Sequence, residues 1–379
     1  MLAGISANSR EFYFRVLGAM KKLILFSSIV LLACGGSEDE EPQSQNNFPH
    51  LEEIEVPETY KDDPVETVTQ LPDGKILITQ AKYFGSLANA HNRAFLFNPS
   101  DKTFEDLGTM IRFRQDYSAQ LLPNGKVLAI GGYRSGDDYH TTSELFDPTT
   151  KTWTTAAEST VQLPNDESVL TNNRIFTNKA TFDIGSNSWI PFDFHRRNTV
   201  IKLMKDGRVM FAGGEHSLDQ IHSAKYQIVN PETLEVETEG MMNQEYYNHS
   251  MVVLDDGRIM IGGGNREVHI DANPHIEIYD PITDTWTVDE SKVIYNSDGC
   301  LFRQSNNKVV AIDYNFSEHF LFDPSTNAWT DITGTFPFCQ SCPETIDMGN
   351  GKMLLFFRTK DTNEGSSTYS NKVYIYTEQ

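Results

Sequence analysis

The stretch 255-DDGRIMIGGG-264 decides the fold of this chain. It holds a polar turn (Asp or Asn, then Gly or Asn, then Lys or Arg) that opens a short apolar run, and the run ends in glycines. The turn recurs at residues 73–75, 124–126, 172–174, 206–208, 256–258, 306–308 and 350–352. Gly tolerates the positive φ of a tight hairpin turn, so each copy predicts a β-hairpin.

A second phrase follows each of the first six turns. It has an aromatic residue or Val, then Asn or Asp (usually before Pro), and Trp or another apolar residue seven positions after the first. The pairs are Phe97/Phe104, Phe146/Trp153, Phe182/Trp189, Val229/Val236, Tyr279/Trp286 and Phe322/Trp329, and they include all four Trp of the chain. A period of about fifty residues with several short strands per unit is typical of a β-propeller.

The turns predict an all-β, seven-bladed propeller. The last unit ends with the strand-like residues 373–376, and its outer strand must come from elsewhere. Residues 50–56 form the one unassigned apolar stretch, so we expect them to pair with the last unit and close the ring, which removes exposed sheet edges. Six blades are the alternative, because the third unit is degenerate.

The two phrases together resemble the kelch repeat, N/D-G-K/R…G-G…F/Y-D-P-x-T-x-x-W. The match is good in the second and fifth units and partial elsewhere, and the resemblance covers residues 60–379. The central domain of galactose oxidase shares this repeat. The resemblance implies a propeller that acts mainly as a binding platform. The fold by itself does not determine the function.

The first residues look like a targeting segment. Met20-Lys21-Lys22 is a basic start, and the apolar residues 23–32 have the length of a signal sequence. Residues 31–34 (LLAC) resemble a bacterial lipobox, which implies a lipidated Cys34. We therefore expect an upstream extension and signal peptide in residues 1–33, a flexible lipidated tether in 34–47 and a propeller in 48–379. The start codon, Met1 or Met20, stays open.

The predicted tether also contains a feature that indicates the cellular location. Acidic residues 37–41 resemble the export tag of surface lipoproteins in Bacteroidetes-type bacteria. The sequence thus predicts an outer-membrane lipoprotein on the cell surface, with a periplasm-facing one as the alternative. The formal net charge of −22 opposes binding to nucleic acid or to anionic membranes, so membrane contact is expected only through the lipid. We expect a monomer without cofactor or metal.

The cysteines are expected to serve structure. Cys339 and Cys342 form a C-x-x-C pair without a matching second pair for zinc, which favours a local disulfide between them in an oxidising compartment. Cys300 lies in an apolar run and is predicted to be a buried free thiol.

Arginines gather in the loops predicted to share one face. These loops join each blade to the next or follow the glycine pairs. The candidate ligand-binding residues are Arg112, Arg114, Arg134, Arg196, Arg197, Tyr246, Tyr247, Arg266 and Tyr295. Guanidinium groups bind carboxylates or sulfates bidentately and tyrosine rings stack on sugars, so the cluster favours an anionic glycan or a peptide carboxylate. The alternative is structural, because such side chains can hydrogen-bond a neighbouring blade.

Three functions remain open. The first is a binding module for an anionic glycan or a partner protein. The second is a polysaccharide lyase or sugar epimerase acting on acidic glycans, for which His195, Arg196, Arg197, Tyr246 and Tyr247 are candidate catalytic residues. The third and lowest is a galactose-oxidase-like oxidase, whose Tyr–Cys crosslink has only Cys300 as a candidate thiol here.

Overall fold

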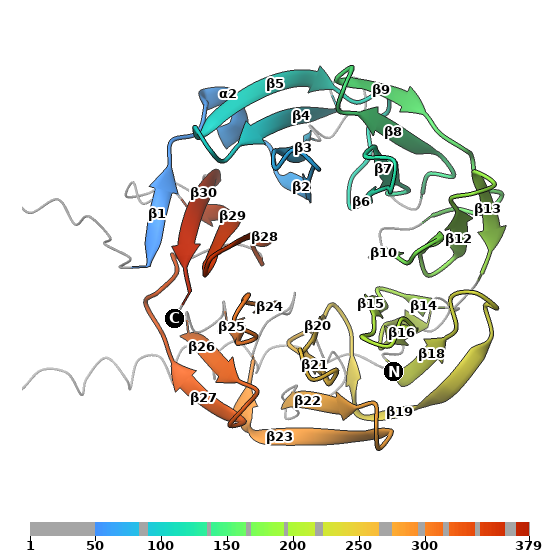
Figure 1. Cartoon of the computed structure of the whole chain (residues 1–379), viewed down its shortest axis with the longest axis vertical. Coiled ribbons are helices and arrows are strands. Elements are labelled where there is room, and N and C mark those ends of the chain that lie inside the picture. Colours follow the sequence, from blue (N-terminus) through green and yellow to red (C-terminus); the bar gives the residue numbers. More distant parts are fainter. Residues whose placement is uncertain are drawn as a thin grey trace, which may run out of the picture. The chain divides into compact units, whose positions relative to one another are not determined.

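Seven four-stranded antiparallel sheets are arranged in a ring (Figure 1). The computed structural model describes residues 50–82, 90–134, 138–163, 168–192, 196–216, 223–264, 275–294, 300–313, 318–337, 342–360 and 369–378. All of them belong to the compact unit Phe48–Gln379; Met1–Asn47 forms a separate unit that lies outside the described residues, as do Cys34 and the predicted tether.

Six blades run from an inner to an outer strand in chain order, and the seventh takes its outer strand from the start of the propeller. Blades one and two contain β2 (Val65–Gln70), β3 (Ile76–Lys82), β4 (His91–Asn98) and β5 (Thr103–Thr109), then β6 (Ser118–Leu121), β7 (Val127–Ile130), β8 (Ser143–Asp147) and β9 (Thr152–Thr155). Blades three and four contain β10 (Val169–Leu170), β11 (Arg174–Phe176), β12 (Ala180–Asp183) and β13 (Ser188–Pro191), then β15 (Val200–Leu203), β16 (Val209–Ala212), β18 (Ser223–Val229) and β19 (Val236–Tyr246).

The remaining blades follow the same plan. Blades five and six contain β20 (Ser250–Val253), β21 (Ile259–Gly262), β22 (His275–Asp280) and β23 (Thr285–Val293), then β24 (Leu301–Arg303), β25 (Val309–Asp313), β26 (Glu318–Asp323) and β27 (Ala328–Asp331). Blade seven contains β28 (Glu344–Gly349), β29 (Lys352–Lys360), β30 (Tyr369–Thr377) and β1 (Leu51–Ile54). The small elements are α2 (Glu58–Lys61) and the two-residue pair β14 (Arg196–Arg197) and β17 (Glu215–His216).

The seven recurring turns all join the first and second strands of a blade. In the turn between β2 and β3, the Asp73 carboxylate accepts a hydrogen bond from the Lys75 backbone N–H (3.1 Å), and Gly74 has a φ of +82°. In the corresponding turn of blade six, Asn307 takes the place of Gly with a φ of +68°. Asn tolerates this left-handed conformation, which explains why the turn still forms there.

The second phrase corresponds to a cross-strand pair between the third and fourth strands. Phe146 lies opposite Trp153 with ring centroids 5.1 Å apart, and the Val229/Val236 pair occupies the same register in blade four. The hairpin between these strands brings residues seven positions apart opposite each other. The repeat spacing therefore places two large side chains in contact. The Trp positions also bridge blades: Trp286 of blade five lies 5.5 Å from the ring of Tyr226 in blade four.

The ring closes as predicted. β1 pairs antiparallel with β30, with Leu51 opposite Tyr376 and Ile54 opposite Val373. The third blade is present with short strands, so the structure has seven blades and not six. An N-terminal strand thus completes the C-terminal sheet.

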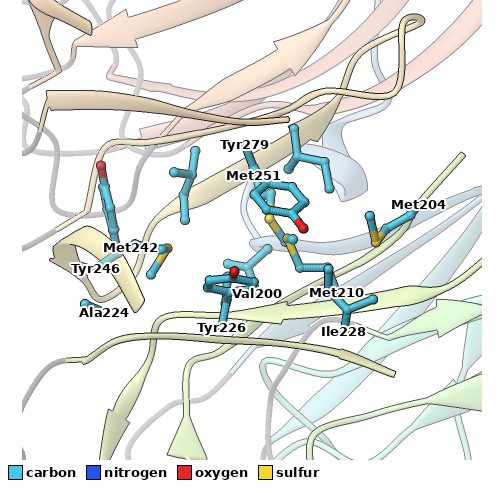
Figure 2. Close-up of a cluster of buried hydrophobic side chains, with 13 residues drawn as sticks. Val200, Met204, Met210, Ala224, Tyr226, Ile228, Met242, Tyr246, Met251 and Tyr279 are labelled. Atoms are coloured by element: carbon cyan, nitrogen blue, oxygen red, sulfur yellow. The ribbon is translucent and has the colours of Figure 1, made fainter. Parts of the chain in front are cut away.

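The core lies between neighbouring blades. Figure 2 shows one such layer, in which Val200, Met210 and Tyr226 of blade four face Met251 and Tyr279 of blade five. Alternation along each strand explains this arrangement: successive side chains of an inner strand point to the blade before and the blade after.

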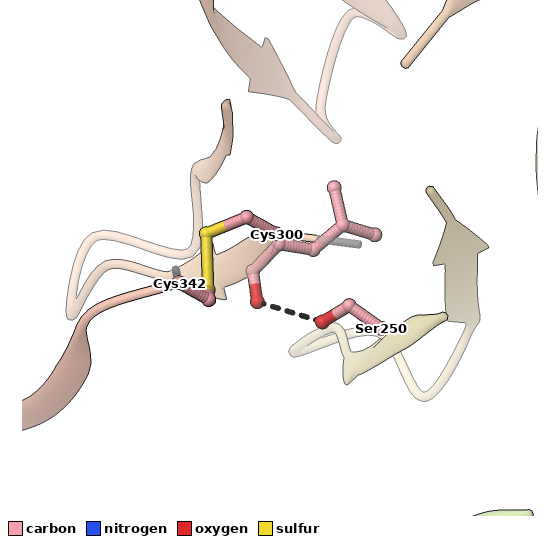
Figure 3. Close-up of a disulfide and its surroundings, with 4 residues drawn as sticks. Ser250, Cys300 and Cys342 are labelled. Carbon is pink, nitrogen blue, oxygen red and sulfur yellow. Dashed lines mark hydrogen bonds between the residues drawn. A yellow bond between two sulfur atoms is a disulfide. The ribbon is translucent and has the colours of Figure 1, made fainter. Parts of the chain in front are cut away.

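Two cysteine predictions were wrong, the Cys339–Cys342 disulfide and the free thiol at Cys300. The disulfide joins Cys300 to Cys342, with Cα atoms 5.1 Å apart, and Cys339 lies outside the described residues (Figure 3). Cys300 is therefore not a free thiol. Only the packing of blade six against blade seven brings together two residues that are 42 positions apart, and sequence spacing does not report this.

Candidate functional site

The two predicted sets of loops meet on one face of the ring. In blade two, Gln115 of an inter-blade connection pairs with Tyr133, which follows a glycine pair. In blade four, Arg197 pairs with Glu215 in the same way. We call the surface built by these connections the loop-bearing face.

Two cavities lie along the axis of the ring, walled by inner strands. The larger axial cavity has a volume of about 500 Å³ and is lined by residues 248–252, 301–303 and 342–345 together with Lys202. The smaller axial cavity has a volume of about 310 Å³ and is lined by residues 66–68 and 116–120, Ser168, Lys202 and Glu344. Lys202 and Glu344 contribute to both walls, so the two cavities are neighbours.

The smaller axial cavity is rich in carboxylates. Glu66, Asp116 and Glu344 come from three different parts of the chain, and Glu66 Oε2 accepts the backbone N–H of Asp116 at 2.6 Å. Burial raises the pKa of Glu66 to about 8; the Asp116 and Glu344 charges add to the rise, and the Asp116 backbone N–H opposes it. A protonated Glu66 is the consequence at neutral pH, because an ionised group there would be poorly solvated and repelled by its neighbours.

The larger axial cavity has a mixed lining. Lys202 and Arg303 bring positive charge, and Arg303 is held by Asp255 at 2.7 Å. His249 is 6 % exposed, and burial lowers its pKa to about 3 although the Ala212 carbonyl favours the protonated ring. Its imidazole is therefore neutral.

Gly213 explains the position of His249. A Cβ at Gly213 would lie 2.5 Å from the imidazole Cε1, so only glycine leaves room for the ring. This fit indicates that the His249 ring serves the packing between blades four and five. Ser250 is also used structurally, since its hydroxyl donates to the Leu301 carbonyl at 3.1 Å.

Arg114 is buried and does not face a ligand. Its side chain is fully buried, and its guanidinium donates to the Gly131 carbonyl (2.7 Å), to the Thr142 carbonyl (3.0 Å) and to Glu144 Oε1 (2.8 Å). The structure thus corrects its placement in the ligand-binding set. The acidic partner of this internal arginine is Glu144.

The other described arginines differ in how far their charge is available to a ligand. Arg112 is exposed, and its backbone N–H donates to Glu144. Arg134 is exposed but forms an ion pair with Asp138 at 2.5 Å, which reduces the charge it presents to a ligand. Among the described arginines of these loops, the charge available to a ligand is therefore smaller than their number in the sequence suggested.

The predicted ligand-binding tyrosines Tyr246 and Tyr247 differ in burial. Tyr246 is 1 % exposed; its hydroxyl donates to the His275 carbonyl at 2.7 Å, and burial raises its pKa well above the usual value. Tyr246 is a core residue, which corrects its assignment to ligand binding. Tyr247 is half-buried beside it.

Several predicted residues cannot be placed. Arg196 and Arg197 form β14 by their backbones, and their side chains are outside the described part of the structure. His195, Arg266 and Tyr295 lie outside the described residues altogether. The arginine-rich loops are thus only partly tested.

The axial residues were missed from the sequence. Glu66, Lys202 and Glu344 were not candidates, although each is a charged residue within or at the start of a predicted inner strand. A charge inside a run that should pack between blades was the available signal.

The described residues lack two features. None of the helices there has the length and apolar character needed to cross a membrane. No group of three or more His, Cys, Asp or Glu side chains in the same residues has an arrangement suited to a metal ion.

Comparisons with known proteins agree with the repeat. Residues 122–160 match the kelch motif. The chain is a seven-bladed β-propeller that carries a kelch motif in the region of its second blade. It is similar to an F-box/kelch-repeat protein of Arabidopsis thaliana, with 26 % identity over 126 residues that cover 29 % of this chain and 32 % of that protein. The match thus spans about a third of the length of that relative.

A solved structure supports the fold alone. The streptogramin B lyase structure has a TM-score of 0.57 and 12 % sequence identity, and the match covers 86 % of this chain and 97 % of that chain. At this identity the likeness shows a shared ring of blades and carries no chemistry.

Proposed function

We propose that this kelch-type propeller is a binding module that holds a segment of a partner protein at the axial cavities. The main support is that residues from several blades place positive and negative charges around two adjoining cavities. Lys202 and Glu344 line both cavities. A protein segment supplies acidic, basic and apolar side chains together, so it can complement such a mixed surface.

An acidic glycan fits this surface less well. A polyanion would meet Asp116, Glu344 and the net charge of −22, while Arg114 is buried and Arg134 is paired. It would gain mainly from the exposed Arg112 and from loops whose side chains are not described. We therefore place the anionic glycan second.

A lyase or epimerase gains little support. Tyr246, one of its candidate bases, is buried and its hydroxyl is committed to the His275 carbonyl, while a catalytic base must reach a substrate proton. The other candidate residues belong to segments whose side chains are not described or, for Tyr247, to a half-buried position.

We further propose that Cys34 is lipidated and that the propeller is displayed on the outer membrane of a bacterium. The supporting observations are the lipobox-like sequence and the acidic residues after it. The Cys300–Cys342 disulfide agrees with an oxidising compartment. Incorporation of labelled palmitate that disappears in Cys34→Ala is the expected result, and equal labelling of both proteins would contradict it.

The binding proposal is tested with a displayed random peptide library and, in parallel, an acidic polysaccharide array. We expect enriched peptides whose affinity, measured by calorimetry, falls about tenfold or more with Lys202→Ala and with Glu344→Gln, a loss typical of a central contact. Lys151→Ala is the matched control, because Lys151 is half-exposed at an outer hairpin turn of blade two and paired with Glu105. Binding of polysaccharides alone, sensitive to Arg112→Ala and Arg197→Ala, would replace this proposal with the glycan module.

A further inference from the structure

The disulfide crosses from one blade to the next at the wall of the larger axial cavity. Cys300 directly precedes β24 of blade six, and Cys342 lies two residues before β28 of blade seven (Figure 3). Cys342 is also part of the cavity lining. One covalent bond therefore ties the inner strands of two blades at the place where the cavity lies.

The junction of blades six and seven combines a shared apolar cluster, which includes Phe336 and Phe357, with inner strands that make few direct contacts. β20 packs closely against β15 on one side and β24 on the other, and β2 packs closely against β6 and β28. Like β6 and β10, the inner strands β24 and β28 make few direct contacts, and residues at both strands line the larger axial cavity. The disulfide adds a covalent connection between these two inner strands, beside the apolar cluster.

The two sulfur atoms differ in how they can be reached. Cys300 is fully buried in a cluster that includes Phe302, Phe336 and Phe357. Cys342 is half-buried at the edge of this cluster and lines the cavity. An attacking thiolate can therefore reach the Cys342 sulfur from the cavity, and the Cys300 sulfur leaves into an apolar interior.

We propose that the Cys300–Cys342 disulfide is a redox-sensitive latch between blades six and seven, opened through the larger axial cavity by a dithiol reductant. One thiolate of the reductant attacks the Cys342 sulfur, and the electron pair of the broken S–S bond leaves on Cys300, which takes up a proton. The second thiol then displaces Cys342 as a thiol. The protein disulfide is reduced to two thiols and the dithiol is oxidised to its own disulfide.

Burial makes this latch slow to open. A thiol in apolar surroundings has a raised pKa, and a leaving thiol of high pKa leaves slowly. A partner that occupies the cavity would cover Cys342 and slow the reaction further. This last consequence rests on the proposed function; the latch itself does not.

The experiment compares the full chain before and after treatment with dithiothreitol, by peptide-resolved hydrogen–deuterium exchange. We expect exchange to rise about tenfold or more in peptides covering residues 300–303 and 342–349, with residues 65–70 and 118–121 unchanged, because a local opening affects only its own cooperative unit. We also expect Cys300→Ala/Cys342→Ala to show the same pattern without reductant and to lower Tm by about 5 °C or more.

Cys339→Ser is the matched control, because it keeps both cysteines of the disulfide. It should behave like the unchanged protein before and after reduction. Unchanged exchange on reduction, or a rise spread evenly over all blades, would overturn the latch. If the local rise occurs but the peptides selected above do not slow reduction, the latch stands and the placement of the partner in the larger axial cavity fails.

Discussion

At the scale of single residues, the surroundings decide what a charged side chain does. Arg114 and Arg134 stand in the same loop region of blade two, yet Arg114 is enclosed with Glu144 and Arg134 is exposed with Asp138. A buried ion pair of this kind needs both members, since the loss of one leaves an uncompensated charge. The residue types therefore predicted the charges of these side chains correctly but did not predict their solvent exposure.

Glu66 gives a prediction on pH at this scale. Its folded pKa of about 8 lies above the ordinary value of 4.5, so the folded protein holds a proton that the unfolded chain has lost between these values. This contribution to stability is complete below about pH 4.5 and is lost as pH rises towards 8. Glu66→Gln should flatten the decline in unfolding free energy from pH 5 to 8, as measured in urea.

The control for this prediction is Glu55→Gln, because Glu55 is exposed and outside the axial cavities. It should leave the pH profile of stability unchanged. A Glu66→Gln protein with the same pH slope as the unchanged protein would show that Glu66 is ionised in the folded state.

At the scale of elements, the inter-strand turns and the closing strand carry the architecture. β1 has only four residues, but it completes the blade in which the chain ends and buries Ile54 against Phe97 and Val373. Pairing the first strand with the last converts an open series of blades into a ring. This one element therefore supports the packing at both ends of the chain.

Ile54→Ala tests that role. Ile54 is 2 % exposed, so its truncation should lower the free energy of unfolding by about 2–4 kcal/mol, the range for buried aliphatic residues. Glu55→Ala, one residue later and exposed, should change it by less than about 0.5 kcal/mol. Equal effects of the two substitutions in denaturant titrations would argue against a closing function for β1.

At the scale of the whole molecule, the propeller Phe48–Gln379 is a unit with its own core. Removal of residues 1–47 should keep the β-type circular dichroism spectrum and leave Tm within about 2 °C, because every described core contact lies within the remaining unit. Removal of residues 1–56, which also deletes β1, is the comparison and should lower Tm clearly. A similar loss in both would show that the first unit contributes to stability.

The sequence by itself determined the architecture, because turn chemistry and cross-strand pairing are local. The Asp-Gly-Lys/Arg turns and the seven-residue Phe/Trp spacing depend on neighbours within one hairpin, so they could be counted directly, and the closing strand followed as the only apolar stretch left. These features predicted seven blades and their boundaries.

Only the tertiary structure decided the site and the disulfide. Cys300 meets Cys342, and Glu66 meets Asp116 and Glu344, because residues from different blades converge on one axis. Burial, which separates Arg114 from Arg112 and Tyr246 from Tyr247, is likewise a property of the assembled ring. The repeat pattern reflects interactions within one blade, whereas contacts between blades depend on how the ring closes.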